Sequence, residues 1–398
     1  MRESSPNLTG LRPTRAIVDL DAIAGNVQAL RAMLPKSTEL MAVVKADAYG
    51  HGAPWIARVA LEAGAKVLAV ATVSEGQELR FQGIAAPIVL LGSIEPDEVV
   101  AACRASLEIT VADEVLLEAV QLAARSETLS SRVAVHLKID TGLRRNGALP
   151  ELATSLAARI AVDPELRFAG IFTHFASADE PGDSFTADQL QRFAQAIDDI
   201  RDAGVACPPT HAANSAAIIT GQGTHFELVR AGIALYGVPP SADVPLPEGM
   251  TPALRIESHI TRIFRIEPGD TVGYNRTYRA ERSTRGALIP IGYADGYRRS
   301  LSGRAWVGIN GHRAPVLGRV SMDQIVVEVP PGAQADIGDA VAILDGNAAQ
   351  CAPGITELAE LMGTNGYEVL TGIRRRIPRV YIKDGEIFGV RPARGGQT

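Results

Sequence analysis

The chain has 398 residues, of which 46% are hydrophobic and 21% are charged, a balance typical of a folded globular protein. Its length exceeds what one compact core usually accommodates, so we expect two domains. The net charge is −6 and no block of like charges forms a basic patch, which argues against nucleic acid as a partner.

Short β-branched runs alternate with helical segments from residue 39 to about residue 235. This α/β alternation predicts eight parallel strands joined by helices. Eight such strands favour a closed (β/α)8 barrel of the TIM type over an open sheet. The predicted strands cover 39–45, 66–72, 87–92, 107–111, 133–140, 167–174, 210–213 and 227–233, and the clearest helices cover 53–63, 96–104, 150–161 and 188–204.

A stretch rich in proline and glycine follows Tyr236 and can continue neither a helix nor a strand, so we predict a linker there. Beyond it, turn-forming pairs punctuate β-rich segments. We therefore predict a barrel domain over residues 1–240 and a mainly β domain over residues 241–398. The early run AIVDL at 16–20 precedes the barrel strands, and periodicity leaves open whether it pairs with the second domain's sheet instead.

The cysteines and the apolar runs indicate the compartment. Cys103, Cys207 and Cys351 are odd in number and form no CxxC pair, so we expect neither a disulfide framework nor a zinc cluster. No apolar run approaches the ~18 residues that span a bilayer, and the basic start has no apolar segment behind it. We expect a cytoplasmic protein without a membrane partner.

A lysine closes the first predicted barrel strand. The strand is apolar up to Lys45, and the small residues that follow bring Tyr49 within reach of a ligand. A lysine at the end of a buried strand is partly desolvated, which lowers its pKa and frees the amine to form a Schiff base. The alternative is a structural lysine that buries its stem and keeps its ammonium group in water.

Polar side chains occur at further strand ends, where a barrel of this type carries its reactive groups. Arg145 lies in a Gly-flanked loop and suits a carboxylate or phenolate oxygen, whereas His174 ends the sixth strand at the mouth of the barrel. Asn214 and Ser215 lie at a predicted helix start that suits a phosphate. Arg230 is a lone charge in the eighth strand and needs an acceptor. Each residue alone is more often structural, but their recurrence favours a functional site.

Other chemistries lack their motifs. His51, His136, His174 and His211 lie near strand ends, but there is no HxH or HExxH pattern, so we expect no metal. There is also no GxSxG elbow, no GxGxxG after a strand and no P-loop, which argues against serine hydrolase, dinucleotide and nucleoside triphosphate chemistry.

The segment AVVKADAYGHG, which contains Lys45, resembles the pyridoxal-phosphate segment of bacterial alanine racemases. The resemblance implies a barrel followed by a β domain, pyridoxal 5′-phosphate as the cofactor, and a homodimer whose active sites are each completed by the partner's β domain. It also implies interconversion of L-alanine and D-alanine, which supplies D-alanine for peptidoglycan. Eight further segments match in the family's order: KIDTGLRRNG, THFASADE, HAANSAA, VRAGIALYG, VGYNRTY, IGYADGYRR, GRVSMDQ and YEVLTGI.

The same resemblance implies two catalytic bases. Racemisation needs a proton to leave one face of Cα and another to arrive on the opposite face. Lys45 would hold the cofactor and serve the D-side proton, and Tyr274 of the other subunit would serve the L-side proton. A tyrosine with an ordinary pKa of about 10 is a poor base at neutral pH. His174 and Arg230 would therefore stabilise its phenolate.

The resemblance further assigns the ligand contacts. Arg230 would face the pyridine nitrogen, and because arginine keeps its proton the ring would stay neutral, which disfavours transamination. Arg145 and the backbone of Met322 would bind the substrate carboxylate, and Lys138 matches a lysine that is carbamylated in some relatives. The implied cofactor-binding residues are Lys45, Tyr49, His174, Asn214, Ser215, Arg230, Gly232, Ile233 and Tyr367.

Three positions depart from the family pattern and leave alternatives open. These positions are Leu143, Asn146 and Asn365, and the two asparagines add polarity near the expected substrate, so a broad-specificity amino-acid racemase remains an alternative. A barrel-type pyridoxal-phosphate decarboxylase is less favoured, because Cys351 is not in the context which those enzymes require. A non-catalytic pyridoxal-phosphate-binding protein made of the barrel alone does not account for the C-terminal ~150 residues.

Overall fold

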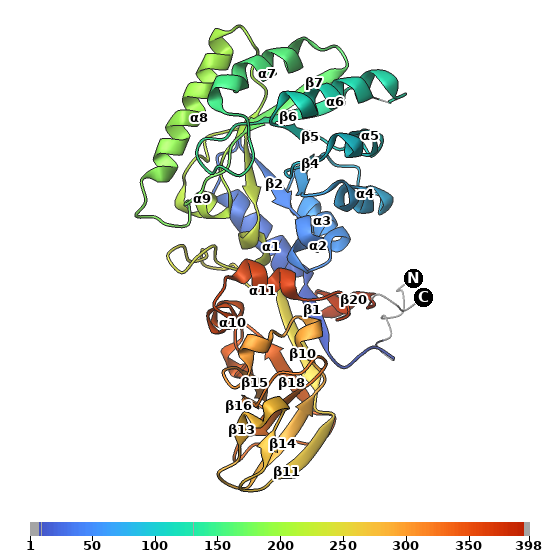
Figure 1. Cartoon of the computed structure of the whole chain (residues 1–398), viewed down its shortest axis with the longest axis vertical. Helices are drawn as coiled ribbons and strands as arrows, with labels where there is room; N and C mark the ends of the chain where they lie inside the picture. Colours follow the sequence, from blue (N-terminus) through green and yellow to red (C-terminus); the bar gives the residue numbers. More distant parts are fainter. Residues whose placement is uncertain (1–7, 9, 130, 394–398) are drawn as a thin grey trace. The chain divides into compact units, whose positions relative to one another are not determined.

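A computed structural model describes residues 8, 10–129 and 131–393 (Figure 1). The chain divides into two compact units. One unit runs from Ile23 to Met250, and the other combines the chain up to Ala22 with the residues from Thr251 onward. This division differs from the expected boundary at residue 240, and it places the early part of the chain with the second unit.

A parallel β-barrel forms the first unit. In the described residues, eight parallel strands follow the order β4-β3-β2-β9-β8-β7-β6-β5. The ring closes where Glu108 N donates to Ile88 O and Leu90 N donates to Glu108 O, both at 2.9 Å. Every predicted barrel strand is therefore confirmed. The strands are β2 (Glu39–Val43), β3 (Val67–Val70), β4 (Ile88–Leu90), β5 (Ile109–Val111), β6 (Val133–Lys138), β7 (Leu166–Phe172), β8 (Thr210–His211) and β9 (Leu228–Ala231).

Helices connect these strands and surround them (Figure 1). Local capping explains several helix ends: Thr72 and Glu75 form a capping box, and Asp113 accepts from Leu116 N. The helix predicted over 188–204 ends at Asp202, with Ala203 as its C-cap and Gly204 next in the left-handed region with φ +80°. The helices are α1 (Leu20–Ala32), α2 (Lys45–Tyr49), α3 (Ala53–Glu62), α4 (Val73–Phe81), η1 (Pro96–Glu98), α5 (Val99–Arg104), α6 (Glu114–Ser126), α7 (Pro150–Val162), α8 (Phe185–Asp202), α9 (Ser215–Thr220) and η2 (Ile233–Tyr236).

A mixed sheet organises the second unit. In the described part of the chain it contains ten strands in the order β11-β14-β17-β16-β15-β18-β10-β1-β19-β20. The strands are β1 (Arg15–Asp19), β10 (Leu254–His259), β11 (Arg262–Ile266), β14 (Thr284–Ile289), β15 (Trp306–Ile309), β16 (His312–Leu317), β17 (Ile325–Val329), β18 (Ala340–Leu344), β19 (Arg379–Lys383) and β20 (Glu386–Arg391), and a separate pair comprises β12 (Thr271–Val272) and β13 (Tyr278–Arg279).

β1 resolves the ambiguity of the early run. It pairs antiparallel with β10 and parallel with β19, so it belongs to the second unit's sheet. The pair Asn310-Gly311 forms a two-residue hairpin turn, with φ of +47° and +72° and with Ile309 opposite His312. Helical segments are also present: η3 (Tyr274–Arg276), η4 (Tyr293–Asp295), η5 (Arg299–Leu301), η6 (Ala348–Gln350), α10 (Ile355–Met362) and α11 (Gly366–Gly372).

None of the helices in the described ranges has the length and the apolar character needed to cross a membrane.

Candidate active site

Lys45 lies at the mouth of the barrel, two residues after β2. The next four residues, Ala46 to Tyr49, have φ between +51° and +56° and form a left-handed turn. This conformation costs roughly 1–2 kcal/mol per residue for side chains with a Cβ. Local contacts hold the turn: Ala46 N donates to Glu75 Oε1 at 2.7 Å, and Ala53 N donates to Asp47 Oδ1 at 3.0 Å. The strained turn fixes the backbone directly after the lysine.

Two amines at the mouth have depressed pKa values. Burial lowers the pKa of Lys45, and the charges of Arg145 and Arg230 lower it further, whereas Glu75 opposes them. Burial also lowers the pKa of Lys138 to about 8, together with Arg145, Arg230 and Lys45. Lowering the pKa raises the fraction of uncharged amine, which is the nucleophilic form.

Arg230 is buried beside His174, and acceptors surround its guanidinium group. Nη2 donates to Thr173 O and Ala212 O, both at 2.8 Å, and to His174 Nδ1 at 3.1 Å. Nη1 donates to His211 Nδ1 at 2.7 Å. Burial lowers the pKa of Arg230 to about 9, which leaves it a cation at neutral pH.

His174 is held neutral. Burial lowers its pKa well below 6.5, and the charges of Arg230, Arg145, Lys138 and Lys45 act in the same direction. Since Arg230 donates to Nδ1, the ring proton lies on Nε2. The mouth thus combines a neutral histidine with a concentration of positive charge that suits an anionic ligand.

Asn214 and Ser215 form the predicted helix start. Asn214 caps α9 by accepting from Ala217 N at 3.0 Å. Ser215 Oγ accepts from Gly232 N at 2.8 Å and from Ala234 N at 3.3 Å. A Cβ at Gly232 would lie 3.1 Å from Tyr49 Oη and 3.7 Å from Ser215 Oγ. The glycine therefore leaves room beside two hydroxyl groups.

Arg145 lies exposed in the loop that follows β6. Asp140 Oδ1 shapes this loop by accepting from Gly142 N at 2.8 Å and from Arg144 N at 3.1 Å. Gly147 has φ +145°, and a Cβ there would lie 2.6 Å from Asp140 N. Only glycine therefore fits at the point where the loop returns to the strand.

The second unit carries the remaining predicted residues. Tyr274 is 69% exposed in η3, directly after Gly273, whose added Cβ would lie 3.0 Å from Arg319 N. The loop with Met322 lies against η4, where Ala294 N donates to Met322 O at 3.0 Å. These contacts bring the chain segments that carry Tyr274 and Met322 to one region of the unit.

Tyr367 lies in the first turn of α11. Asn365, which departs from the family pattern two residues before it, has a local explanation. Asn365 caps α11 by accepting from Glu368 N at 3.1 Å. The asparagine therefore begins a helix, a role that the sequence comparison with the family pattern did not suggest.

The first unit thus brings together the predicted residues Lys45, Tyr49, Lys138, Arg145, His174, Asn214, Ser215, Arg230, Gly232 and Ile233. Sequence reasoning missed Glu75, which contacts the turn after Lys45, and treated His211 only as a metal candidate. The capping pattern TVSE at 72–75 is the sequence signal that could identify Glu75. Arg230 is a single charge in an apolar strand, which indicates that it needs a buried hydrogen-bond partner such as His211.

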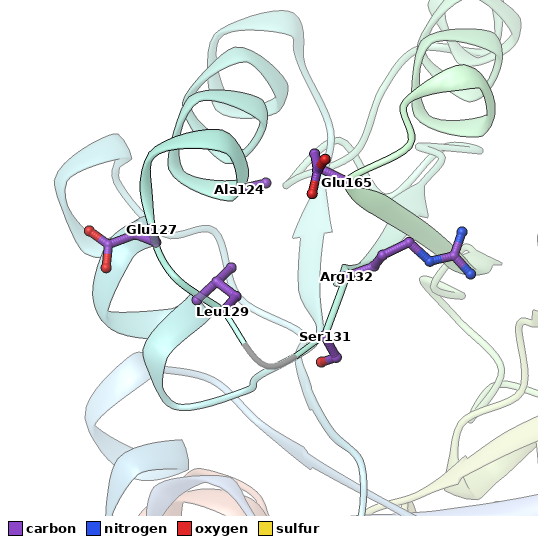
Figure 2. Close-up of a pocket in the computed structure, with 6 residues that line it drawn as sticks. All are labelled: Ala124, Glu127, Leu129, Ser131, Arg132 and Glu165. Carbon is purple, nitrogen blue, oxygen red and sulfur yellow. The ribbon is translucent and has the colours of Figure 1, made fainter.

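Surface hollows lie at the other end of the barrel. One of them has a volume of about 270 Å³. Figure 2 shows the side chains that line it. Arg132 and Glu165 in its lining directly precede β6 and β7, so it lies at the amino ends of these strands, away from the lysine. It contains none of the predicted site residues. Its lining residues are Ala124, Glu127, Leu129, Ser131, Arg132 and Glu165.

A closed parallel barrel with a depressed-pKa lysine, several cations and a neutral histidine at its mouth defines a barrel enzyme built around an amine nucleophile. The family model of the alanine racemase N-terminal domain matches residues 18–240, and that of the alanine racemase C-terminal domain matches residues 253–381. The chain belongs to the alanine racemase family.

Individual relatives match along nearly the whole chain. Alanine racemase of Symbiobacterium thermophilum is 42% identical over 94% of this chain and 98% of the relative. Alanine racemase 2 of Bacillus subtilis is 39% identical over 94% of this chain and 95% of the relative. The crystal structure of alanine racemase from Bacillus anthracis with bound L-Ala-P has a TM-score of 0.89 and 37% identity, and the match covers 96% of this chain and 98% of that one. The expected barrel followed by a mainly β domain is confirmed.

Proposed function

We propose that this chain is a pyridoxal-phosphate-dependent enzyme that interconverts L-alanine and D-alanine and so supplies D-alanine for peptidoglycan. The observation that carries the proposal is the lowered pKa of Lys45. The positive charge of Arg230, which is hydrogen-bonded to His174, contributes to that lowering. Full-length relatives described as alanine racemases support the choice of alanine.

The mouth of the barrel fits a phosphorylated aldehyde cofactor. Lys45 offers an amine, and the space that a Cβ at Gly232 would fill lies beside the hydroxyl groups of Tyr49 and Ser215. When bound, pyridoxal phosphate supplies a carbonyl for the amino group and an electron sink that acidifies Cα. We assign Arg230 to the pyridine nitrogen. We assign the phosphate to Tyr49, Asn214, Ser215, Gly232, Ile233 and Tyr367.

The protein's side chains then position the amino acid and move its protons. Arg145 and the Met322 backbone would hold the carboxylate, since a guanidinium group binds it with two parallel hydrogen bonds. Lys45 would exchange the proton on the D face of Cα and Tyr274 the proton on the L face. His174, with its proton on Nε2, would donate to the phenolate of Tyr274.

We place Tyr274 of one subunit at the barrel mouth of a second copy. The observation in support is that Tyr274 is 69% exposed on the β unit of its own chain, as a side chain reserved for a partner would be. The resemblance to head-to-tail dimeric racemases favours the same arrangement. We also propose a cytoplasmic location, in keeping with Cys103, Cys207 and Cys351, which are unpaired.

The proposal is tested by incubating the cofactor-loaded protein with L-alanine and separately with D-alanine, followed by chiral chromatography. Both reactions should approach an equal mixture of L-alanine and D-alanine. The Lys45→Ala variant should form none of the opposite enantiomer from either substrate. Retention of the starting enantiomer would contradict the proposal, and release of carbon dioxide would indicate the decarboxylase instead.

A broad-specificity racemase is the second candidate, because Leu143 and Asn146 flank the arginine assigned to the substrate carboxylate. Serine, lysine and arginine in the same assay distinguish the two candidates. Racemisation of these amino acids at rates close to that of alanine would favour broad specificity.

A further inference from the structure

A continuous chain of hydrogen-bonding side chains crosses the interior of the barrel. It starts at Arg230, whose Nη1 lies 2.7 Å from His211 Nδ1. His211 Nε2 lies 3.5 Å from His136 Nδ1, and His136 Nε2 lies 2.7 Å from Glu108 Oε2. Arg167 closes the chain by donating to Glu108 Oε1 at 2.6 Å. Glu108 directly precedes β5, so the chain ends at the opposite side of the barrel from Lys45.

The surrounding residues are shaped to hold this chain. His136, His211 and Arg230 are at most 3% exposed. The Phe172 ring stacks on the His211 ring with a centroid distance of 4.7 Å and an angle of 4°. A Cβ at Gly170 would lie 2.4 Å from His136 Nδ1, so only a glycine leaves room for that ring. Barrel interiors are normally filled by branched aliphatic side chains, and these polar groups therefore call for a specific role.

From Arg230 to Glu108 the donors of this hydrogen-bonded chain all point the same way, toward Glu108. Arginine has no acceptor, so His211 Nδ1 must accept from Arg230. Burial and the charge of Arg230 lower the pKa of His211 well below 6.5, which leaves the ring neutral with its proton on Nε2. His136 Nδ1 must then accept from His211, and the proton of His136 lies on Nε2, facing Glu108.

Glu108 terminates the chain as an acceptor at both oxygens. Burial by itself would raise the pKa of this carboxyl group, but the hydrogen bond from His136 and the charge of Arg167 outweigh it, so the pKa is lowered. A carboxylate has no proton of its own to donate. It therefore accepts from whichever side chains face it, and both neighbours supply an N–H.

We propose that Glu108 is a positioning residue for Arg230, which it orients through His136 and His211. With no acceptor at position 108, the proton of His136 can move to Nδ1, where it would oppose the Nε2–H of His211. A matching shift in His211 would then turn an N–H toward Arg230 and displace the guanidinium group. The effect on catalysis rests on the proposed function of Arg230, whereas the proton positions do not.

Two substitutions separate the acceptor from the charge. Glu108→Met keeps an unbranched side chain of similar length and removes the strong acceptor. Glu108→Gln removes the charge and leaves one acceptor oxygen in place of two. The side chain of Arg167 is 49% exposed and can turn to water, so the remaining oxygen can accept from His136. Glu127→Gln is the control, because it interrupts an ion pair between Glu127 and Arg104. Arg104 lines the same surface hollow as Glu108 but takes no part in the hydrogen bonds from Arg230 to Arg167.

Neutron diffraction from crystals of the cofactor-loaded protein locates the protons. We expect deuterium on Nε2 of both His136 and His211, and bare Nδ1 atoms. For Glu108→Met we expect kcat to fall about ten- to a hundredfold while KM changes little, since a small misplacement of a catalytic group has effects of this size. Glu108→Gln should keep most of the kcat, and Glu127→Gln should keep all of it.

Three results would overturn the inference. The first is deuterium on Nδ1 of either histidine in the unsubstituted protein, a result that requires no variant to fold. The second is an unchanged kcat in Glu108→Met, and the third is an equal loss in Glu108→Gln and Glu108→Met. If the protons lie as expected but the unsubstituted protein does not racemise alanine, the proposed function fails while the ordered chain stands.

Discussion

Arg230 donates through Nη2 to His174 Nδ1 at 3.1 Å. This contact leaves Nε2 as the nitrogen of His174 that carries the proton. The positive charge of Arg230 also contributes, after burial, to holding the pKa of His174 well below 6.5. Burial and this one arginine together therefore make the histidine a neutral ring with an N–H on Nε2, the form that can donate a hydrogen bond to an anionic oxygen.

The first prediction concerns the residue that carries the cofactor. Borohydride reduction of the loaded protein, followed by peptide mapping, should leave the pyridoxyl adduct on Lys45. Lys138 is the demanding internal control, because its pKa of about 8 also makes it nucleophilic. Lys66, which is exposed, is the second control. An adduct on either control residue would refute the assignment.

The second prediction concerns sharing of the active site between subunits. Inactive Lys45→Ala and Tyr274→Phe proteins, mixed under conditions of subunit exchange, should regain up to about a quarter of the unsubstituted activity, because half of the dimers are mixed and each has one intact site. Racemase activity and native mass spectrometry follow recovery and exchange. Demonstrated exchange without recovery would place both residues of a site in one chain.

The third prediction concerns the two faces of the substrate. Tyr274→Phe should slow the exchange of the Cα proton of L-alanine with deuterated solvent about 10²- to 10⁴-fold, the usual effect of losing a general base. Exchange of D-alanine should persist, because Lys45 still serves its face. Proton NMR measures both rates. An equal loss for the two enantiomers, with the cofactor still bound, would assign Tyr274 a packing role.

The fourth prediction concerns stability against acid. The pKa values of His174 and His211 are well below 6.5 in the folded protein, whereas an unfolded histidine has a pKa of about 6.5. The unfolded state therefore binds more protons below about pH 6.5. The stabilisation is present above this pH and is lost as the pH falls, by up to about 1.4 kcal/mol per histidine and pH unit.

Urea unfolding between pH 7 and pH 5 measures this dependence. His211→Gln should weaken the slope of the unfolding free energy against pH by the contribution of one histidine. His225→Gln, at an exposed position, should leave the slope unchanged. Equal slopes in the two variants would contradict the assignment of His211 as a buried neutral ring.

Much of the architecture follows from local sequence patterns. The sequence predicts the barrel strands because β-branched runs and helical segments alternate, and the apolar pattern that distinguishes the two kinds of element extends over only a few neighbouring residues. The hairpin at Asn310-Gly311 follows from the ability of those two residues to adopt positive φ. Lys45 and Arg230 were identified because charges at the ends of, or within, apolar strands stand out against their background.

Other features depend on contacts between distant parts of the chain. β1 has the same pattern as a barrel strand, and only its pairing with β10 and β19 assigns it to the other sheet. The left-handed turn after Lys45 contains no glycine among its four strained residues, so no propensity predicts it, and the distant Glu75 stabilises it. The order of protons from Arg230 to Glu108 exists only because the barrel brings side chains of β6, β8 and β9 together with that of Glu108, which precedes β5, and each buried donor there must find an acceptor.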